Sequence, residues 1–303
     1  MQLRGGRMTE VRSFGRVKVI LGPKNGKYPY GNSIVVEDDT TALIDPSLWV
    51  FESNGKVTER NIDLLFNSHY HEDHGVGNCL FPDHPLHIHP LDAPAMRSLD
   101  TILEYYGMDE ATNAAWTPIM VEKFRYQPRD RFVDLHDGQV FDFGHTKMRV
   151  IHTPGHTGGH CCFFFEQEEL LFLADWDMTR FGPMYGDVTS DLMATIASLE
   201  QIRALQAKVL VSFHHVGICE DGQDALVTRY LDIVYERERL LLDFLATPRT
   251  LEEVIKKRII YRKDYPDVMW VDAVEKNSML LHLRKLIEEG RVAQEEEHYW
   301  RCP

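Results

Sequence analysis

Residues 69–74 read His69-Tyr70-His71-Glu72-Asp73-His74. They follow the apolar run 62–66, and an apolar run that ends in polar residues is typical of a buried strand entering a loop. On a continued strand His69 and His71 point to the same side, and Asp73 and His74 then come from the next turn. Imidazole and carboxylate groups bind borderline divalent metals. One ion rarely takes four ligands from so short a segment, so we expect two ions.

More ligand candidates follow apolar runs further along the chain. His156 lies in the loop 153–160, which reads Thr-Pro-Gly-His-Thr-Gly-Gly-His, Asp175 ends the run 170–174, and His214 follows the run 209–211. In α/β folds, functional groups gather where strands end. We therefore expect these side chains to complete the site begun by residues 69–74.

Some assignments have alternatives. Asp177 competes with Asp175, although it does not end the apolar run, and His215 competes with His214. Asp45, at the end of the run 41–44, is either a partner for a ligand imidazole or a turn residue.

The hydrophobic pattern predicts an α/β fold with buried sheets. We expect strands at 17–21, 33–37, 41–44, 62–66, 86–89, 140–143, 148–151, 161–165, 170–174 and 209–211. We expect helices at 92–106, 191–206 and 226–245, and an irregular insertion over 109–130. On a strand, Cys161 and Cys162 point to opposite faces and serve packing.

The pattern changes near residue 245, where Thr247-Pro248 ends a helix. A short helix at 251–257 with a capping box at Thr250, a helix at 277–289 and a hairpin at 291–300 resemble a winged-helix module. We therefore expect one domain over 1–245 and a second over 246–303.

The charge distribution argues against broad binding to nucleic acid. The chain has 33 basic and 47 acidic residues, a net charge of −14, and residues 246–303 hold 11 of each sign. The neutral tail lacks the concentrated basic face of a nucleic-acid surface, so we expect it to pack on the core or to form a homodimer contact. With no apolar run of about 18 residues and an odd cysteine count of 5, we expect no membrane span and a reduced, cytoplasmic setting. Met8 is an alternative start to Met1.

The sequence resembles the metallo-β-lactamase superfamily over roughly residues 16–220. The resemblance rests on four features in their order along the chain: His-x-His-x-Asp-His, Pro-Gly-His-Thr, a strand-terminal Asp and a strand-terminal His. The resemblance implies an αββα sandwich with metals at one edge. It implies a first metal on His69, His71 and His156, a second on Asp73, His74 and His214, and Asp175 as the bridge. It implies two divalent ions, with zinc as the first expectation and iron or manganese as alternatives.

This resemblance also suggests a reaction. A water held between two ions becomes a hydroxide nucleophile, and Asp73 orients it and passes a proton to the leaving group. The stretch 153–164 is similar to glyoxalase II, which favours a thioester or another small acyl substrate. Two divalent ions would make the reactive centre locally positive, so an anionic substrate is also compatible with it. Asp73-His74-Gly75 keeps the second-site histidine that zinc β-lactamases often replace, and this points away from antibiotic hydrolysis. Ala174 in place of glycine before Asp175, and His215 in place of glycine after His214, depart from the usual pattern.

Other functions remain open at this point. Similar proteins with such a tail cleave RNA or other phosphodiesters, but the tail's neutral charge weakens this alternative. A sulfur dioxygenase with one iron conflicts with the complete second ligand set. A non-catalytic binding protein conflicts with the intact ligand set as a whole.

Overall fold

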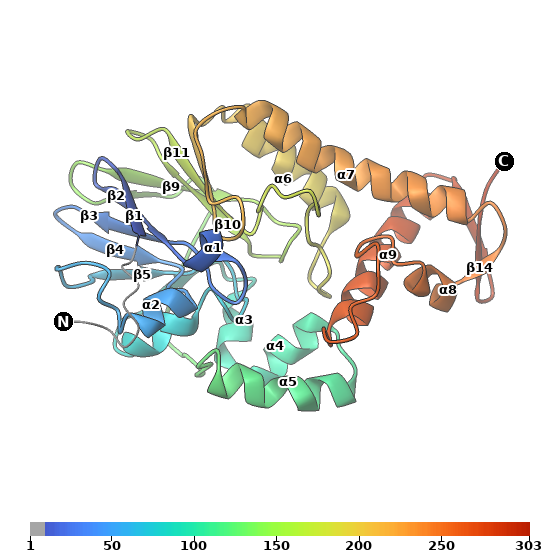
Figure 1. Cartoon of the computed structure of the whole chain (residues 1–303), viewed down its shortest axis with the longest axis horizontal. Coiled ribbons are helices and arrows are strands. Elements are labelled where there is room, and N and C mark those ends of the chain that lie inside the picture. The colour runs from blue at the N-terminus through green and yellow to red at the C-terminus, as the bar shows by residue number, and fades with distance from the viewer. Residues whose placement is uncertain (1–9) are drawn as a thin grey trace.

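Two packed β-sheets form the larger part of the molecule in the computed structural model, which describes residues 10–303 (Figure 1). The choice between Met1 and Met8 as the start lies outside the described residues. The first sheet has the order β1-β2-β3-β4-β5-β6-β7. Its strands are β1 Glu10–Phe14, β2 Val17–Leu21, β3 Ser33–Glu37, β4 Thr41–Ile44, β5 Leu64–Phe66, β6 Leu86–Ile88 and β7 Phe132–Asp134. The second has the order β13-β12-β11-β10-β9-β8, with β8 Val140–Asp142, β9 Lys147–His152, β10 Cys161–Phe165, β11 Leu170–Ala174, β12 Val209–Ser212 and β13 Ile218–Cys219.

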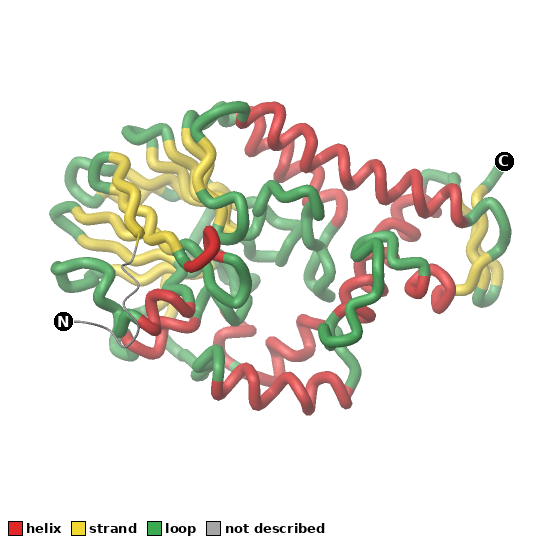
Figure 2. Tube along the Cα trace, viewed as in Figure 1, coloured by secondary structure: helices red, strands yellow, loops and turns green. Residues whose placement is uncertain are grey.

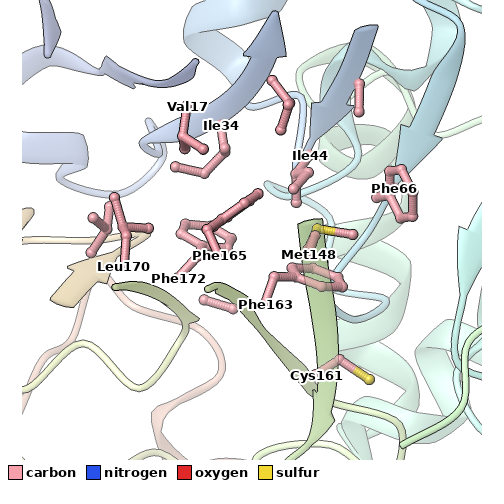
Figure 3. Close-up of a cluster of buried hydrophobic side chains, with 14 of the residues drawn as sticks. Val17, Ile34, Ile44, Phe66, Met148, Cys161, Phe163, Phe165, Leu170 and Phe172 are labelled. Carbon is pink, nitrogen blue, oxygen red and sulfur yellow. The ribbon is translucent and has the colours of Figure 1, made fainter. Parts of the chain in front are cut away.

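The inner faces of the two sheets share one hydrophobic core. Figure 3 shows Ile34 and Phe66 of the first sheet facing Phe163 and Phe172 of the second, and all four side chains are fully buried. Burying an aromatic or branched side chain of this kind stabilises the fold by about 1.5–3 kcal/mol. Because successive strand residues alternate between faces, the other faces of both sheets also carry apolar residues and need cover.

Helices cover both outer faces. The first sheet packs against α2 Leu48–Glu52, α3 Ala93–Arg97, α4 Leu99–Tyr106 and α5 Glu110–Glu122. The second packs against α6 Leu192–Ala204 and α7 Gln223–Phe244. Short helical turns also occur at α1 Pro23–Gly26 and η1 Val76–Leu80. The expected αββα sandwich is confirmed. So is the placement of the adjacent cysteines, since Cys161 lies in the inner core and Cys162 under the outer helices.

The C-terminal part has two helices and a small sheet. They are α8 Leu251–Lys256, α9 Val271–Glu288, β14 Arg249–Thr250, β15 Val292–Glu295 and β16 His298–Arg301, with the sheet order β14-β16-β15. The expected capping box is present, since Thr250 Oγ1 accepts a hydrogen bond from the Glu253 N–H and the Glu253 carboxylate accepts one from the Thr250 N–H. The C-terminal part packs on the core through α7, where Lys285 Nζ and Arg291 donate to the Glu238 carboxylate, Lys285 at 2.6 Å.

Three local predictions were wrong. Residues 109–130, predicted to be irregular, contain α5, which Asp109 caps by accepting from the Thr112 N–H at 2.7 Å. Pro118 lies inside this helix. The predicted helix 92–106 is two helices separated at Ser98, which caps α4, and α9 begins six residues before the predicted 277.

The strands converge on one edge of the sandwich. The pairs β4–β5, β5–β6 and β11–β12 are parallel, so their carboxyl ends lie side by side. In Figure 2 the strands of the two large sheets lie on the left of the molecule and the small C-terminal sheet lies on the right, and many loops lie between the large sheets and the C-terminal helices. Within residues 10–303, no helix is long and apolar enough to cross a membrane, and all five cysteines, which fall in this range, are free thiols.

Candidate metal centre

Each predicted ligand lies just after a strand at this edge. The segment 69–74 follows β5, His156 follows β9, Asp175 follows β11 and His214 follows β12. They form two groups in which the ligand-type atoms lie within 4.8 Å of one another: His69, His71, His156 and Asp175 in the first, and Asp73, His74 and His214 in the second. The structure thus brings all seven predicted site residues together.

Asp175 lies between the two groups. Its Oδ2 is 3.3 Å from His156 Nε2 and 3.8 Å from His69 Nε2, in the first group. Its Oδ1 is 2.9 Å from His74 Nε2 and 3.7 Å from His214 Nε2, in the second. One carboxylate therefore presents a different oxygen to each group, which is the arrangement needed to share it between two ions.

Two donor atoms in the centre are buried without a hydrogen-bond partner. They are His69 Nε2 and Asp73 Oδ2. Asp73 Oδ2 lies 2.9 Å from His214 Nε2, so it faces another ligand-type atom of the second group. A buried polar atom without a partner costs about 1–3 kcal/mol. Unpaired imidazole and carboxylate atoms that converge on one region fit bound divalent cations.

The remaining nitrogen of each second-group imidazole is held by an acceptor. His74 Nδ1 lies 2.8 Å from Asp45 Oδ2, and His214 Nδ1 lies 2.6 Å from the Gly26 carbonyl. Asp45 therefore is a partner of an imidazole, and Ser68 fixes it further by donating its N–H at 2.7 Å. Such contacts orient an imidazole and make it a stronger ligand.

The first group is held by the loop between β11 and α6. His156 Nδ1 lies 2.9 Å from the Met184 carbonyl, and His71 Nε2 lies 2.7 Å from Asp187 Oδ2. His71 Nδ1 then faces the site, 3.0 Å from His156 Nε2. Tyr70 also donates to Asp187. Sequence reasoning missed Asp187, because it follows no strand and belongs to no motif.

Two other residues that fix the ligand loops were also missed. Asp92 accepts from Thr157 Oγ1 and the Gly159 N–H, both at 2.7 Å, and so holds the loop that carries His156. His160 Nε2 accepts from the Asp175 N–H at 3.3 Å. The histidine of the Gly-Gly-His stretch was visible in the sequence, but its partner was not.

Electrostatics at the centre favour cations. Burial lowers the pKa of His214, but the Asp175 and Asp73 carboxylates outweigh burial and raise it to about 9. Burial likewise lowers the pKa of His74, and Asp175 and Asp45 raise it well above its usual value. Burial and then the neighbouring His74 lower the pKa of His69, so this imidazole is neutral. The carboxylates that raise the pKa of these two imidazoles also attract divalent ions.

The sequence alternatives lie outside the two groups. His215 is exposed, with a backbone φ of 56°, and it belongs to neither group. Asp177 belongs to neither group, and its Oδ1 accepts from Tyr230 Oη at 2.9 Å and from the Thr179 N–H at 3.2 Å. The geometry favours His214 and Asp175.

A cavity of about 550 Å³ adjoins the centre. His71, Asp73, His156, Asp175 and His214 line its inner end. Its other walls include Tyr106, Met108 and Trp116 from the segment 97–130, and Tyr261, Trp270 and Val274 from the C-terminal part. Among the described residues that line it, none is a lysine or an arginine.

A buried arginine supports the loop between β11 and α6. Arg237 of α7 is fully buried and donates to the Pro183 carbonyl at 2.6 Å, to the Phe181 carbonyl at 2.7 Å and to Tyr185 Oη at 2.9 Å. The C-terminal helix α9 holds the same loop, since Asn277 Nδ2 donates to the Gly186 carbonyl at 2.8 Å.

The chain has two packed sheets, and imidazoles and carboxylates cluster at one edge of them. This combination is typical of α/β proteins that bind metal ions where strands end. Residues 28–215 match the Metallo-beta-lactamase superfamily, and residues 250–300 match the Beta-lactamase associated winged helix domain. Because the first match covers more than half of the chain, the chain belongs to the metallo-beta-lactamase superfamily. The expected superfamily and the winged-helix module are confirmed.

Curated relatives are hydrolases by name. An atrochrysone carboxyl ACP thioesterase of Pseudocercospora fijiensis is 28% identical over 178 residues, which cover 56% of this chain and 50% of the relative. A hydroxyacylglutathione hydrolase of Francisella tularensis subsp. novicida is 35% identical over 92 residues, 28% of this chain and 35% of the relative. The chain spans about half the length, or less, of these curated relatives.

Solved structures support the fold across the whole chain. A metallo-beta-lactamase family protein from Thermus thermophilus has a TM-score of 0.71 at 22% identity and covers 95% of this chain and 99% of its own. A beta-lactamase domain protein from Burkholderia ambifaria has a TM-score of 0.76 at 14% identity, with 99% and 97% covered. These likenesses include the C-terminal part, so the arrangement of both parts occurs in other proteins.

Proposed function

We propose that the protein is a dinuclear metal hydrolase that cleaves thioesters. The observation that carries this proposal is the position of Asp175, whose two oxygens face two separate groups of ligand-type atoms. His69, His71, His156 and Asp175 would hold one ion, and Asp73, His74, His214 and Asp175 would hold the other. Zinc suits this donor set, and iron or manganese can occupy the same ligands.

Two bound ions would lower the pKa of a water between them and polarise the carbonyl under attack. The chain's own contribution is to hold the ligands in place, through Asp45, Asp187 and the Gly26 and Met184 carbonyls. Asp73 Oδ2 lies in the centre, 2.9 Å from His214 Nε2, and with the ions bound it could orient the attacking water and accept its proton.

A thiolate leaving group suits this site, because the tyrosines beside the centre are not free to donate a proton. A thiol has a pKa near ~8.5, so the thiolate leaves without a strong proton donor. Both tyrosines that face the inner cavity, Tyr28 and Tyr106, donate to the Glu72 carboxylate, at 2.9 and 2.6 Å. Their phenols are thereby committed, and burial and then Glu72 raise the pKa of each. The names of the thioesterase and hydroxyacylglutathione hydrolase relatives support the same bond type.

A phosphodiester or RNA substrate has less support. Lys285 and Arg291, two of the basic residues in the tail, pair with Glu238 and Glu289. The described cavity wall also has no lysine or arginine to hold a phosphate. A cytoplasmic location and a homodimer contact stay predictions, as does a domain boundary at 245.

The test is a substrate panel with the zinc-loaded protein. Thioesters, lactones, phosphodiesters and RNA are assayed side by side, with the Asp175→Ala variant as the background. The proposal expects thioester hydrolysis that Asp175→Ala abolishes. Phosphodiester turnover without thioester turnover would contradict it.

A further inference from the structure

The cavity beside the metal centre extends much further than a small acyl group requires. Its volume of about 550 Å³ lies within the roughly 300–1,000 Å³ of sites that enclose drug-sized ligands. The ligand groups supply only five of the residues that line it: His71, Asp73, His156, Asp175 and His214. The rest of the cavity therefore has room for a large part of a substrate.

The walls beyond the metal centre are mainly apolar and aromatic. Tyr28 packs edge-on against Trp270, with ring centroids 5.9 Å apart, and Trp270 packs against Trp116 at 5.3 Å. Tyr28 also lies 6.2 Å from the His214 ring, so the aromatic surface begins at the metal centre. Three segments far apart in the sequence thus build one continuous apolar wall.

Glu72 is the residue that fixes the inner part of this wall. Its Oε1 accepts from Tyr28 Oη and its Oε2 accepts from Tyr106 Oη. Both carboxylate oxygens are therefore occupied, and the two phenol groups are turned toward Glu72. With its charge bonded in this way, Glu72 positions two rings whose carbon faces are available to a ligand.

Charge completes the description of the substrate. The described wall has no lysine or arginine, and it carries the carboxyl groups of Glu72, Asp177 and Asp187, which disfavour an anionic acyl group. Burial of such a group without a partner costs several kcal/mol, whereas each buried methylene gains about 0.8 kcal/mol. The wall therefore selects against charged acyl groups and in favour of apolar ones.

We propose that this cavity is an acyl-binding site, built jointly by residues 99–122 and the C-terminal part, that selects thioesters of bulky apolar acyl groups. The inference rests on the proposed thioesterase function and names its substrate class. The C-terminal winged-helix module then contributes a wall of the substrate site, through Trp270 and Val274, instead of a nucleic-acid surface.

The test compares acyl groups on one leaving group. Acetyl, hexanoyl, decanoyl and 2-naphthoyl thioesters of N-acetylcysteamine are assayed with the zinc-loaded full chain. We expect kcat/KM to rise from acetyl to decanoyl by up to about fourfold per methylene over the part that is buried, which corresponds to ~0.8 kcal/mol each. The naphthoyl substrate distinguishes an aromatic acyl group from an aliphatic one. A kcat/KM that is flat or falls with acyl size, with thioesters still hydrolysed, overturns the acyl site and leaves the thioesterase proposal standing.

Variants of the wall sharpen this test. Trp270→Ala removes a ring from the cavity and Ala273→Phe fills it, and both should lower the ratio of decanoyl to acetyl kcat/KM at least tenfold. Met269→Ala is the matched control, because Met269 adjoins Trp270, is 38% exposed and does not line the cavity. An unchanged ratio in both wall variants would contradict the proposal.

Direct binding keeps the two proposals separate. Decanoate and acetate are titrated into the zinc-loaded protein while tryptophan fluorescence is followed. If no thioester is hydrolysed, the thioesterase proposal fails, and the acyl site then stands only if decanoate binds at least tenfold more tightly than acetate. Equal affinity for the two overturns it.

Discussion

The two ends of the cavity are built in different ways. At the metal end, each ligand lies within a few residues of the end of a strand, and parallel or adjacent strands place these positions together. At the apolar end, the wall comes from Tyr28, from Trp116 in α5 and from Trp270 just before α9. The first end is encoded by short motifs and the second by the packing of distant segments. The proposed catalytic centre and the proposed acyl site are therefore formed by different parts of the chain.

This difference explains what the sequence could predict. His69, His71 and the other ligand candidates followed apolar runs, so strand periodicity located them and the parallel ends brought them together. Asp187 holds His71, but it lies in a loop with no periodic pattern, and only the folded chain shows its partner. The hydrophobic pattern along the sequence does not indicate contacts between distant residues such as Asp187 and His71.

The wrong helix predictions have a similar origin. Residues 109–130 were predicted to be irregular, but α5 forms there with Trp116 and Met120 buried and Pro118 inside the helix. The N-cap Asp109 and the packing of Trp116 against Trp270 stabilise the helix, and the second contact joins residues 154 positions apart. Tertiary packing here outweighs local preference.

The largest expected effect is at the metal end. Asp175→Ala removes the oxygens shared by both groups and should lower kcat/KM at least about 10³-fold for acetyl and decanoyl thioesters alike, since such contacts are worth several kcal/mol. Steady-state kinetics on both substrates checks this. Asp177→Ala is the control: Asp177 belongs to neither ligand group, so this variant should keep the metal content of the unmodified protein. Unequal losses for the two substrates would break the separation of the two ends.

The loop between β11 and α6 connects the two ends, and Arg237 supports it. Arg237→Met leaves the buried oxygens of Pro183 and Tyr185 and the partly buried carbonyl of Phe181 without their donor, at about 1–3 kcal/mol for each buried oxygen. We expect the free energy of unfolding in urea to fall by at least about 3 kcal/mol. Arg239→Met is the matched control on the same helix. Arg239 pairs only at the surface, with Asp243, and such a pair is worth under ~1 kcal/mol. Similar losses in the two variants would contradict this role of Arg237.

A smaller effect depends on pH. Burial, then Arg237 and Lys285, lower the pKa of His282 to about 3, and its Nε2 accepts from Tyr185 Oη at 2.9 Å. Below the unfolded pKa of about 6.5 the unfolded chain binds a proton that the folded chain refuses. This contribution to stability is therefore present above pH ~6.5 and is lost as the pH falls toward 3, by at most about 1.4 kcal/mol per pH unit. The free energy of unfolding in urea is measured between pH 7 and pH 4, and it should fall less with decreasing pH in His282→Gln than in the unmodified protein. His298 is exposed, so the His298→Gln variant should show the same pH dependence of stability as the unmodified protein. An equal pH dependence in the unmodified protein and both variants would contradict the assignment.

The central claim is that Asp175 is shared by two ions, and the metal content of the purified protein tests it most directly. We predict about two equivalents of zinc, iron or manganese per chain by elemental analysis, reduced to background in His69→Ala and in Asp175→Ala. One equivalent per chain that is indifferent to Asp175→Ala would contradict the claim.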